Sequence, residues 1–332
     1  MRVLVVGGAG YIGSHVCKAL AARGDEPIVF DNLSSGHERA VRWGPLEHGD
    51  VRCEADIDAA LAKHRPAAVV HFAANIEVGE GERDPLTFWN NNVGGAISLL
   101  GAMERASCER LVFSSTCAVY GHPTSLPLAE DEPQNPVNVY GRSKLVVERM
   151  LRDISAAKGL RYAALRYFNA AGASPDGEIG EEHDPETHLI PNALMAAAGV
   201  GGRLKVFGDD YDTPDGTCIR DYIHVMDLAQ AHLAALDRIT THEGSFACNV
   251  GTGRGYSVRE VIDAVEQVTG QVVPHDICAR RPGDPPRLYA DVSRARDLLQ
   301  LQPEFSELDR MVGDAWGFYR AKWTKAFRLP GG

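Results

Sequence analysis

Residues 2–13 of the chain read RVLVVGGAGYIG, and this stretch decides the fold. It opens with the continuous apolar run Val3–Val6, which is typical of a buried parallel strand. Gly7, Gly10 and Gly13 follow at G-x-x-G-x-x-G spacing, and a helical pattern begins directly after them. Glycines between a strand and a helix let the backbone approach a pyrophosphate, and the helix N-terminus adds unpaired N–H groups. The stretch therefore predicts the first turn of a dinucleotide-binding fold, with an ordinary helix start as the alternative.

Strand and helix patterns alternate along the first half of the chain. The strand patterns are short hydrophobic runs at Arg2–Val6, Pro27–Phe30, Ala67–Phe72, Arg110–Ser115 and Tyr162–Tyr167. The helical patterns lie at Tyr11–Arg23, Asp56–His64, Asp84–Ala106 and Val139–Lys158. This order predicts an α/β fold with a Rossmann-type doubly wound parallel sheet, because helices must connect parallel strands across both sheet faces.

The alternation of strand and helix patterns stops near Ala171–Asp184. This segment is rich in Gly, Pro, Asp and Glu, which predicts a loop. The patterns beyond it are a helix near Ile190–Ala198, a strand at Leu204–Phe207, a helix at Met226–Arg238, a strand at Phe246–Val250 and a capped helix at Ser257–Thr269. We therefore expect residues 1–168 to form the dinucleotide-binding domain, with segments near 220–250 packing back on it. Residues 169–332 would form a smaller α+β domain for the substrate, leaving a cleft between the two.

Composition narrows the classes of partner. The 332 residues are 44% hydrophobic and 24% charged, which is ordinary for a globular chain, and the net charge of −11 disfavours nucleic acid and anionic membranes. No segment approaches the ~18 apolar residues of a membrane span, and no signal peptide is visible. Seven cysteines without a C-x-x-C pair predict free thiols in the cytoplasm. The His and Cys residues show no tight ligand spacing, so we expect no metal.

The second predicted strand ends at Asp31, about 20 residues after the glycine loop. A carboxylate at this point accepts hydrogen bonds from the hydroxyls of an adenosine ribose and repels a 2′-phosphate. The next five residues, Asn32–Gly36, contain no Arg or Lys that would neutralise such a phosphate. Asp31 therefore favours NAD over NADP, unless it is only a solvated carboxylate at a strand end.

A second pattern indicates proton transfer. Tyr140 and Lys144 open a helical segment and lie one turn apart on one face. A phenol with a pKa of about 10 is a poor base at neutral pH, and a nearby ammonium favours the phenolate. Thr116 follows the strand Arg110–Ser115, so its hydroxyl would lie at the carboxyl edge of the sheet, where doubly wound folds bind ligands. We interpret the three as catalytic; the alternatives are a surface helix pair and a strand-end cap.

The glycine loop, Asp31, the hydroxyl run ending at Thr116 and Tyr140-x-x-x-Lys144, in that order, resemble the extended short-chain dehydrogenase/reductase family. Further segments resemble its nucleotide-sugar 4-epimerases: His71–Ala74, Asn90–Val93, Leu165–Asn169, Phe207–Tyr211, Arg220–Ala229 and Arg280–Asp284. Dehydratases of the family place an acidic residue directly after the threonine. Cys117 and Ala118 stand there instead, which disfavours dehydration.

The resemblance implies interconversion of UDP-glucose and UDP-galactose by transient oxidation at sugar C4, with Tyr140 as base and a tightly bound NAD that is regenerated in each turnover. The cofactor contacts that it implies are Gly7, Gly10, Tyr11, Ile12, Gly13, Asp31, Asn32, Ser34, Gly36, Asp50, Val51, Phe72, Ala73, Ala74, Asn91, Tyr140, Lys144 and Phe168. The implied UDP-sugar contacts are Thr116, Asn169, Leu189, Lys205, Val206, Phe207, Arg220, Arg281 and Asp284.

The resemblance also implies a homodimer in which Asp84–Ala106 and Val139–Lys158 of two chains form a four-helix bundle. Their apolar stripes equally suit a core within one chain. Two other functions stay open: 4-epimerisation of another UDP-sugar (an N-acetylhexosamine, a pentose or a uronic acid), and a non-catalytic NAD-binding module. Leu288, at the position that limits an N-acetyl group in the family, is of intermediate size and leaves the first of these undecided.

Overall fold

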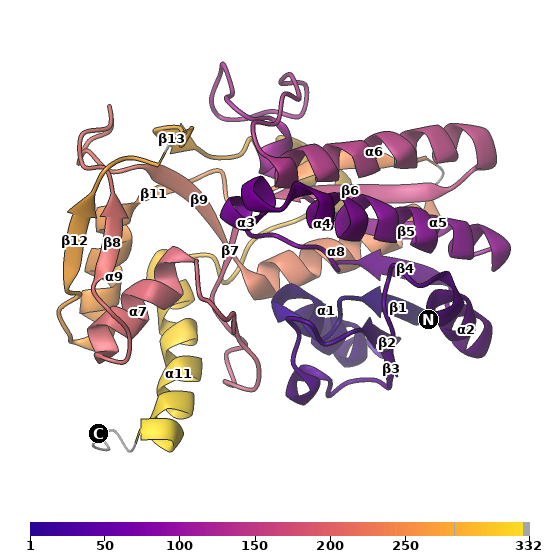
Figure 1. Cartoon of the computed structure of the whole chain (residues 1–332), viewed down its shortest axis with the longest axis horizontal. Helices are drawn as coiled ribbons and strands as arrows, with labels where there is room; N and C mark the ends of the chain where they lie inside the picture. Colours follow the sequence, from indigo (N-terminus) through magenta and orange to yellow (C-terminus); the bar gives the residue numbers. More distant parts are fainter. Residues whose placement is uncertain (243, 282, 328–332) are drawn as a thin grey trace.

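The computed structural model describes residues 1–242, 244–281 and 283–327, and its centre is a sheet of seven parallel strands (Figure 1). In spatial order the strands are β3 (Leu46–His48), β2 (Glu26–Asp31), β1 (Arg2–Val6), β4 (Ala68–His71), β5 (Arg110–Thr116), β6 (Arg161–Tyr167) and β10 (Phe246–Val250). The chain order reverses between β1 and β4, which is the switch point where doubly wound sheets bind ligands. The predicted Rossmann-type α/β sheet is confirmed.

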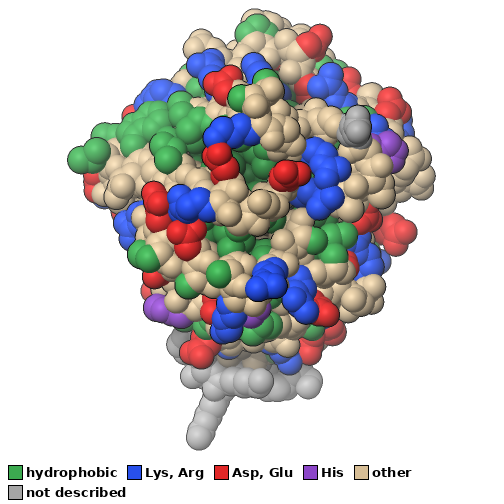
Figure 2. Space-filling view, turned by 90° about the vertical axis from the view of Figure 1, so that its right-hand side faces the viewer, with side chains coloured by type: hydrophobic (Ala, Val, Ile, Leu, Met, Phe, Trp, Pro, Cys, Tyr) green, Lys and Arg blue, Asp and Glu red, His purple; other side chains and the backbone are tan. Residues whose placement is uncertain are grey.

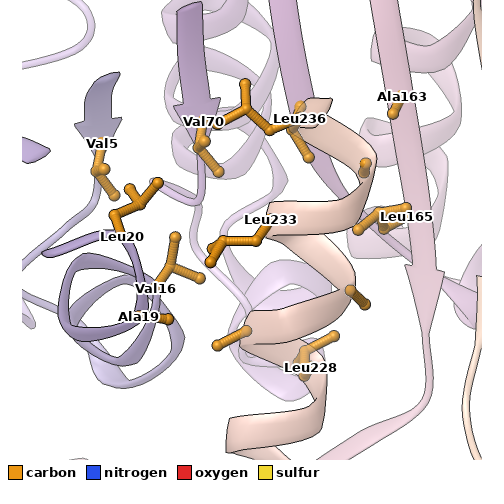
Figure 3. Close-up of a cluster of buried hydrophobic side chains, with 14 of the residues drawn as sticks. Val5, Val16, Ala19, Leu20, Val70, Ala163, Leu165, Leu228, Leu233 and Leu236 are labelled. Carbon is orange, nitrogen blue, oxygen red and sulfur yellow. The ribbon is translucent and has the colours of Figure 1, made fainter. Parts of the chain in front are cut away.

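Helices cover both faces of this sheet. Successive side chains of each strand point to opposite faces, and the apolar side chains on both faces must be buried. Val3 and Val5 pack against the helices α1 (Tyr11–Ala22) and α8 (Val225–Thr241). Leu4 and Val6 point the other way, against α2 (Glu54–His64), α5 (Gly95–Arg105) and α6 (Val139–Lys158). Figure 3 shows Leu20 of α1 and Leu233 of α8 reaching into the first of these layers. Leu20 is fully buried, so truncating it to alanine would cost about 2–5 kcal/mol of stability.

The helix expected over Asp84–Ala106 is not a uniform α-helix, because a π-helical turn interrupts its interior. After α3 (Val78–Arg83), the segment forms α4 (Pro85–Phe88), a π-helical turn at Trp89–Gly94, and then α5. Three consecutive asparagines occupy the π turn, and their short polar side chains compete with the helical backbone for hydrogen bonds. Such turns in helices are frequent at functional sites.

The rest of the chain forms small sheets and helices around a separate core. β8 (Leu204–Phe207) pairs with β12 (His275–Cys278), and β9 (Ile219–His224) pairs with β11 (Gly255–Ser257), β13 (Arg287–Leu288) and β7 (Asn169–Ala171). The helices here are α7 (Leu189–Ala198), α9 (Val258–Thr269), α10 (Ser293–Leu299) and α11 (Leu308–Phe327); α7, α9 and α11 share one apolar cluster, whereas α10 packs on the large sheet. The predicted capping box at Ser257 and Glu260 is present.

None of the helices in the described part of the chain combines the length and hydrophobicity that a membrane crossing requires. Figure 2 shows the face that lies at the right of Figure 1, with charges of both signs interspersed and hydrophobic side chains gathered in one area near its edge.

Candidate active site

The glycine loop lies between the carboxyl ends of β1 and β4. Gly7 has φ +81°, and a Cβ there would lie 2.6 Å from the backbone nitrogen of Ala73. A Cβ on Gly13 would overlap the carbonyl oxygen of Gly7. Gly10 caps α1 without a side-chain hydrogen bond, and the first turn of α1 contains no acidic residue. The loop therefore presents uncapped N–H groups and a positive helix end, which suits a pyrophosphate.

Asp31 ends β2 beside this loop and is 8% exposed. Its Oδ2 accepts a hydrogen bond from Ala9 N at 2.9 Å, and its Oδ1 accepts one from Leu33 N at 2.8 Å. The carboxylate is thus held rigidly at the strand end while each oxygen keeps further acceptor capacity. This geometry suits a ribose diol.

A cavity of about 1270 Å³ runs from the glycine loop to the C-terminal part of the chain. Its volume exceeds the ~300–1,000 Å³ typical of a pocket for one small ligand, so it has room for a cofactor and a substrate together. Every predicted cofactor residue except Asp50 lines it. Asp50 lies outside the lining, where it accepts hydrogen bonds from Arg52 Nε at 2.9 Å and from Asn32 Nδ2 at 3.1 Å. Asp50 therefore orients Asn32, which does line the cavity.

The three predicted catalytic residues meet on one wall of this cavity. Asn138 caps α6 by accepting a hydrogen bond from Gly141 N at 2.7 Å, and this cap starts the helix two residues before Tyr140. Lys144 Nζ donates to the Ser114 carbonyl oxygen at 2.8 Å and lies 5.9 Å from the centre of the Tyr140 ring. Thr116 ends β5 on the same wall.

Burial pushes both titratable groups of this set toward their neutral forms. It lowers the pKa of Lys144 to about 7. It also raises the pKa of Tyr140 above its ordinary value; the nearby Tyr167 raises it further, and a hydrogen bond with Thr116 opposes the shift. Cofactor-free, the pair therefore holds a neutral phenol beside an amine whose pKa is near neutral. An added positive charge near Tyr140 is what the phenolate requires.

Two buried polar groups that the sequence analysis missed support this wall from behind. Asn92, in the π turn, donates from Nδ2 to Ser143 Oγ at 3.0 Å and accepts from Asn75 N at 2.8 Å. It thereby joins the π turn to α6 between Tyr140 and Lys144. The run Asn90–Asn92 is the signal in the sequence that would have indicated such a role.

The second group is a buried ion pair below Thr116. Ser115 donates to Glu148, one turn beyond Lys144 on α6, and Glu148 also accepts from Arg166 Nε at 2.9 Å. Glu148 and Arg166 are each 3% exposed, so removing one partner would leave an uncompensated charge at a cost of about 3–5 kcal/mol. This pair fixes β5, β6 and α6 relative to one another.

The predicted substrate residues divide into two groups. Thr116, Asn169, Arg281 and Asp284 line the cavity, whereas Leu189, Lys205, Val206, Phe207 and Arg220 do not. Two members of the second group, Phe207 and Arg220, nevertheless contact the first. Arg281 lies over the Phe207 ring at 4.0 Å, and Arg220 forms an ion pair with Asp284. His183 and His188 also line the cavity, although no pattern in the sequence predicted them.

The fold and this site together define a dinucleotide-dependent enzyme of the extended short-chain dehydrogenase/reductase class. The family model described as "NAD dependent epimerase/dehydratase family" matches residues 3–251, and the chain belongs to that family. The predicted family resemblance and NAD as the cofactor are thereby confirmed.

Several known proteins are similar along nearly the whole chain. A crystal structure of UDP-glucose 4-epimerase from Brucella ovis in complex with NAD is 54% identical, covers 96% of this chain and 98% of its own, and has a TM-score of 0.93. A UDP-glucose 4-epimerase of Rhizobium leguminosarum bv. trifolii is 52% identical over 317 residues, which is 96% of this chain and 97% of that protein. A UDP-glucose-4-epimerase from Stenotrophomonas maltophila with bound NAD and formylated UDP-arabinopyranose is 41% identical, covers 98% and 99% of the two chains, and has a TM-score of 0.95.

Proposed function

We propose that this chain is an isomerase that interconverts UDP-glucose and UDP-galactose at C4 of the sugar. The observation that carries the proposal is the placement of Tyr140, Lys144 and Thr116 on one wall of the cavity that also holds the glycine loop. A binding module has no need of this set. The names of similar proteins from Rhizobium and Brucella, which cover nearly the whole chain, support the same activity.

In the proposed reaction, Gly7–Gly13 and Asp31 would hold NAD, which when bound would supply reversible hydride transfer at C4 of the sugar. Tyr140 Oη removes the proton of the C4 hydroxyl and gives it back at the end. The Thr116 hydroxyl bridges the sugar oxygen and Tyr140, and Lys144 holds the nicotinamide ribose and favours the phenolate when protonated. Cys117 offers no strong acid, since burial raises its pKa to about 12, so water is not expelled.

The diphosphate of the substrate requires fixed positive charge in an acidic protein. Arg281 lies at the cavity wall, and Arg220 stands directly behind Asp284. We propose that both guanidinium groups bind diphosphate oxygens, with Arg220 leaving Asp284, and that Asp284 then contacts the uridine ribose. Asn169 contributes from the wall, while Leu189 and Lys205–Phe207 form the edge that faces the uracil.

We further propose a cytoplasmic homodimer joined through α5 and α6. Exposed apolar side chains on this part of the surface support the interface: Leu86 on α4 is 76% exposed and Ile97 on α5 is 56% exposed. All seven cysteines are free, which suits a reducing compartment.

The deciding experiment uses purified protein without added cofactor, incubated with UDP-galactose while UDP-glucose and the absorbance of reduced nicotinamide are followed. We expect epimer to form without accumulation of reduced cofactor. Absence of UDP-glucose would overturn the proposal, and stoichiometric reduced cofactor with a keto product would indicate a dehydrogenase. Parallel reactions with UDP-N-acetylglucosamine and UDP-xylose measure the specificity.

A further inference from the structure

A cluster of four side chains at the rim of the cavity has no part in the proposed reaction. The segment Glu181–His188 joins the loop after β7 to the start of α7, and it carries Glu181, His183, Glu186 and His188. One nitrogen or oxygen atom of each lies within 4.8 Å of the corresponding atoms of the other three. Glutamate and histidine therefore converge on one point from an E-x-H-x-x-E-x-H sequence.

Three separations within the cluster are close to those of tetrahedral coordination. A Zn²⁺ ion at about 2.0–2.1 Å from each of four ligands holds those ligands about 3.3 Å apart. His183 Nδ1 lies 3.2 Å from Glu181 Oε1 and 3.7 Å from Glu186 Oε1. His188 Nδ1 lies 3.8 Å from Glu186 Oε1 and also contacts Glu181 Oε1. Small side-chain rotations would bring the four atoms onto one tetrahedron.

One polar atom of the cluster is buried without a hydrogen-bond partner. His183 Nδ1 is buried, and the contact with Glu181 does not have the geometry of a hydrogen bond, so this nitrogen has no hydrogen-bond partner. The Glu181 side chain is 3% exposed and that of Glu186 is 8% exposed. Within the described residues, no lysine or arginine pairs with either carboxylate. Two nearly buried carboxylates thus face two imidazoles, and a divalent cation would neutralise the carboxylates.

The backbone holds these ligands in place before any ion binds. Glu186 Oε1 accepts hydrogen bonds from Thr187 N at 2.8 Å and His188 N at 2.9 Å. Tyr319 of α11 donates to the carbonyl oxygen of Glu181 at 2.7 Å. Asn192 of α7 donates to the carbonyl oxygen of His188 at 2.8 Å. Ligand-bearing residues fixed in this way by neighbouring groups are typical of metal sites.

We propose that Glu181, His183, Glu186 and His188 bind one divalent transition-metal ion, with Zn²⁺ as the best match. Two imidazole nitrogens and two carboxylate oxygens form a complete tetrahedral ligand set, which leaves no open position for substrate. The ion stabilises the rim of the cavity by joining the loop to α7.

The test is metal binding by the full-length protein with its cofactor. After treatment with a chelator and dialysis, the protein is titrated with ZnCl₂ in a calorimeter, and its thermal unfolding is recorded with and without Zn²⁺. We expect one Zn²⁺ per chain and a higher unfolding midpoint. His183→Ala should weaken binding by about 100-fold or more and abolish the shift in midpoint. His122→Ala, at an exposed histidine elsewhere, is the matched control and should bind as the wild type does.

Binding of less than one equivalent, or equal binding by the wild type and His183→Ala, would overturn the proposal. Should His183→Ala fail to fold, Co²⁺ titration of the wild type decides instead. Intense visible bands of four-coordinate Co²⁺ support the site, and the weak bands of octahedral Co²⁺ overturn it. Neither measurement depends on epimerase activity, so failure of the proposed function would leave this test intact.

Discussion

Two walls of the same cavity are assembled in different ways. The sheet edge, meaning the residues that follow β1, β2, β4 and β5 together with the start of α6, gathers its side chains by topology. Adjacent parallel strands end at one edge, so whatever follows them meets there. The C-terminal wall, meaning the lining residues Arg281 and Asp284 with Phe207 and Arg220 that contact them from behind, comes from separate small sheets and loops. Its members are positioned by individual pairs such as Arg220 with Asp284.

Because of this difference, we expect the two walls to tolerate amino-acid substitution to different degrees. Loss of a residue at the sheet edge removes a group that nothing else replaces, because the backbone around it is fixed by the large sheet. Loss of a residue in the C-terminal wall alters a pair whose members, in the proposed mechanism, would exchange partners when ligand binds. Four changes test this contrast, and they are given from the largest expected effect to the smallest.

The largest effect is expected for Tyr140→Phe at the sheet edge. Removing the phenolic oxygen removes the only base that the mechanism uses, so kcat should fall by about 10²–10⁴-fold with little change in KM. Steady-state epimerisation of UDP-galactose measures it. Tyr162→Phe, at a buried tyrosine of β6 outside the cavity, is the control and should retain kcat. Unchanged activity in Tyr140→Phe would refute the mechanism.

Next in size is a pH dependence that arises from Lys144. Burial lowers its pKa to about 7 in the folded, cofactor-free protein, whereas an unfolded chain has a pKa of about 10.4. Between these values the unfolded state binds a proton that the folded state lacks, so stability should rise with pH, by up to about 1.4 kcal/mol per unit. Urea unfolding at pH 7, 8 and 9 measures the slope.

The Lys144→Met variant should lose this contribution, and Lys158→Met, at an exposed position near the end of α6, should keep it. Identical slopes for the wild type and Lys144→Met would show that the buried lysine is charged in the folded state. The comparison between variants cancels the titration of other buried groups, which both proteins share.

The C-terminal wall is tested by Arg220→Gln. Losing hydrogen bonds from a charged donor to phosphate should raise KM for UDP-galactose by about 10–100-fold while kcat changes less. Arg280→Gln is the matched control, because that exposed arginine pairs with Asp210 rather than with Asp284. Asp284→Asn frees Arg220 from its ion pair. A KM that stays constant in Arg220→Gln would assign the pair with Asp284 a purely structural role.

The smallest effect is expected for Ser257→Ala, at the capping box of α9. The Ser257 hydroxyl accepts from Glu260 N at 3.1 Å and also donates to Asp215, so its loss should cost about 1–2 kcal/mol of stability. Both kcat and KM should stay unchanged, since Ser257 lies outside the cavity lining. Denaturant unfolding checks the first expectation and kinetics the second. Reduced activity in the folded variant would show that the C-terminal wall depends on the stability of its own core.

The sequence allowed the sheet and the sheet edge to be predicted because both follow from long, regular patterns. Helix α6 has the predicted bounds, and β1, β8 and β10 do as well. Most of the strands that were missed, such as β3 and β13, are two or three residues long and show no periodicity, but the longer strands β12 and β9, of four and six residues, were missed as well. The π turn was missed because a helical pattern continues on both sides of it.

In the candidate site too, only the residues that belong to a regular local pattern could be predicted from the sequence. Residues next to the glycine loop could be placed from spacing alone, whereas Arg220 and Asp284 are 64 positions apart and their pairing depends on tertiary structure. Asp50 was expected among the cofactor contacts, and in the structure it lies outside the cavity lining, where it accepts a hydrogen bond from Asn32. The cluster around His183 was overlooked because ligand spacing was considered for histidine and cysteine without the glutamates between them.

Because of the π turn at Trp89–Gly94, the number of residues in this helical segment determines which side chains face the cavity. Each residue of a helix turns the chain by about 100°, so deleting one residue to restore regular α-helix would rotate everything on one side of the deletion by that angle. Either Asn91 and Asn92 would turn away from the cavity and from α6, or Leu99 and Met103 of α5 would leave the core. The extra residue of the π turn thus lets one continuous helical segment direct its asparagines toward the cavity and α6 and its later apolar side chains into the core. A uniform α-helix of the same segment could not place both sets.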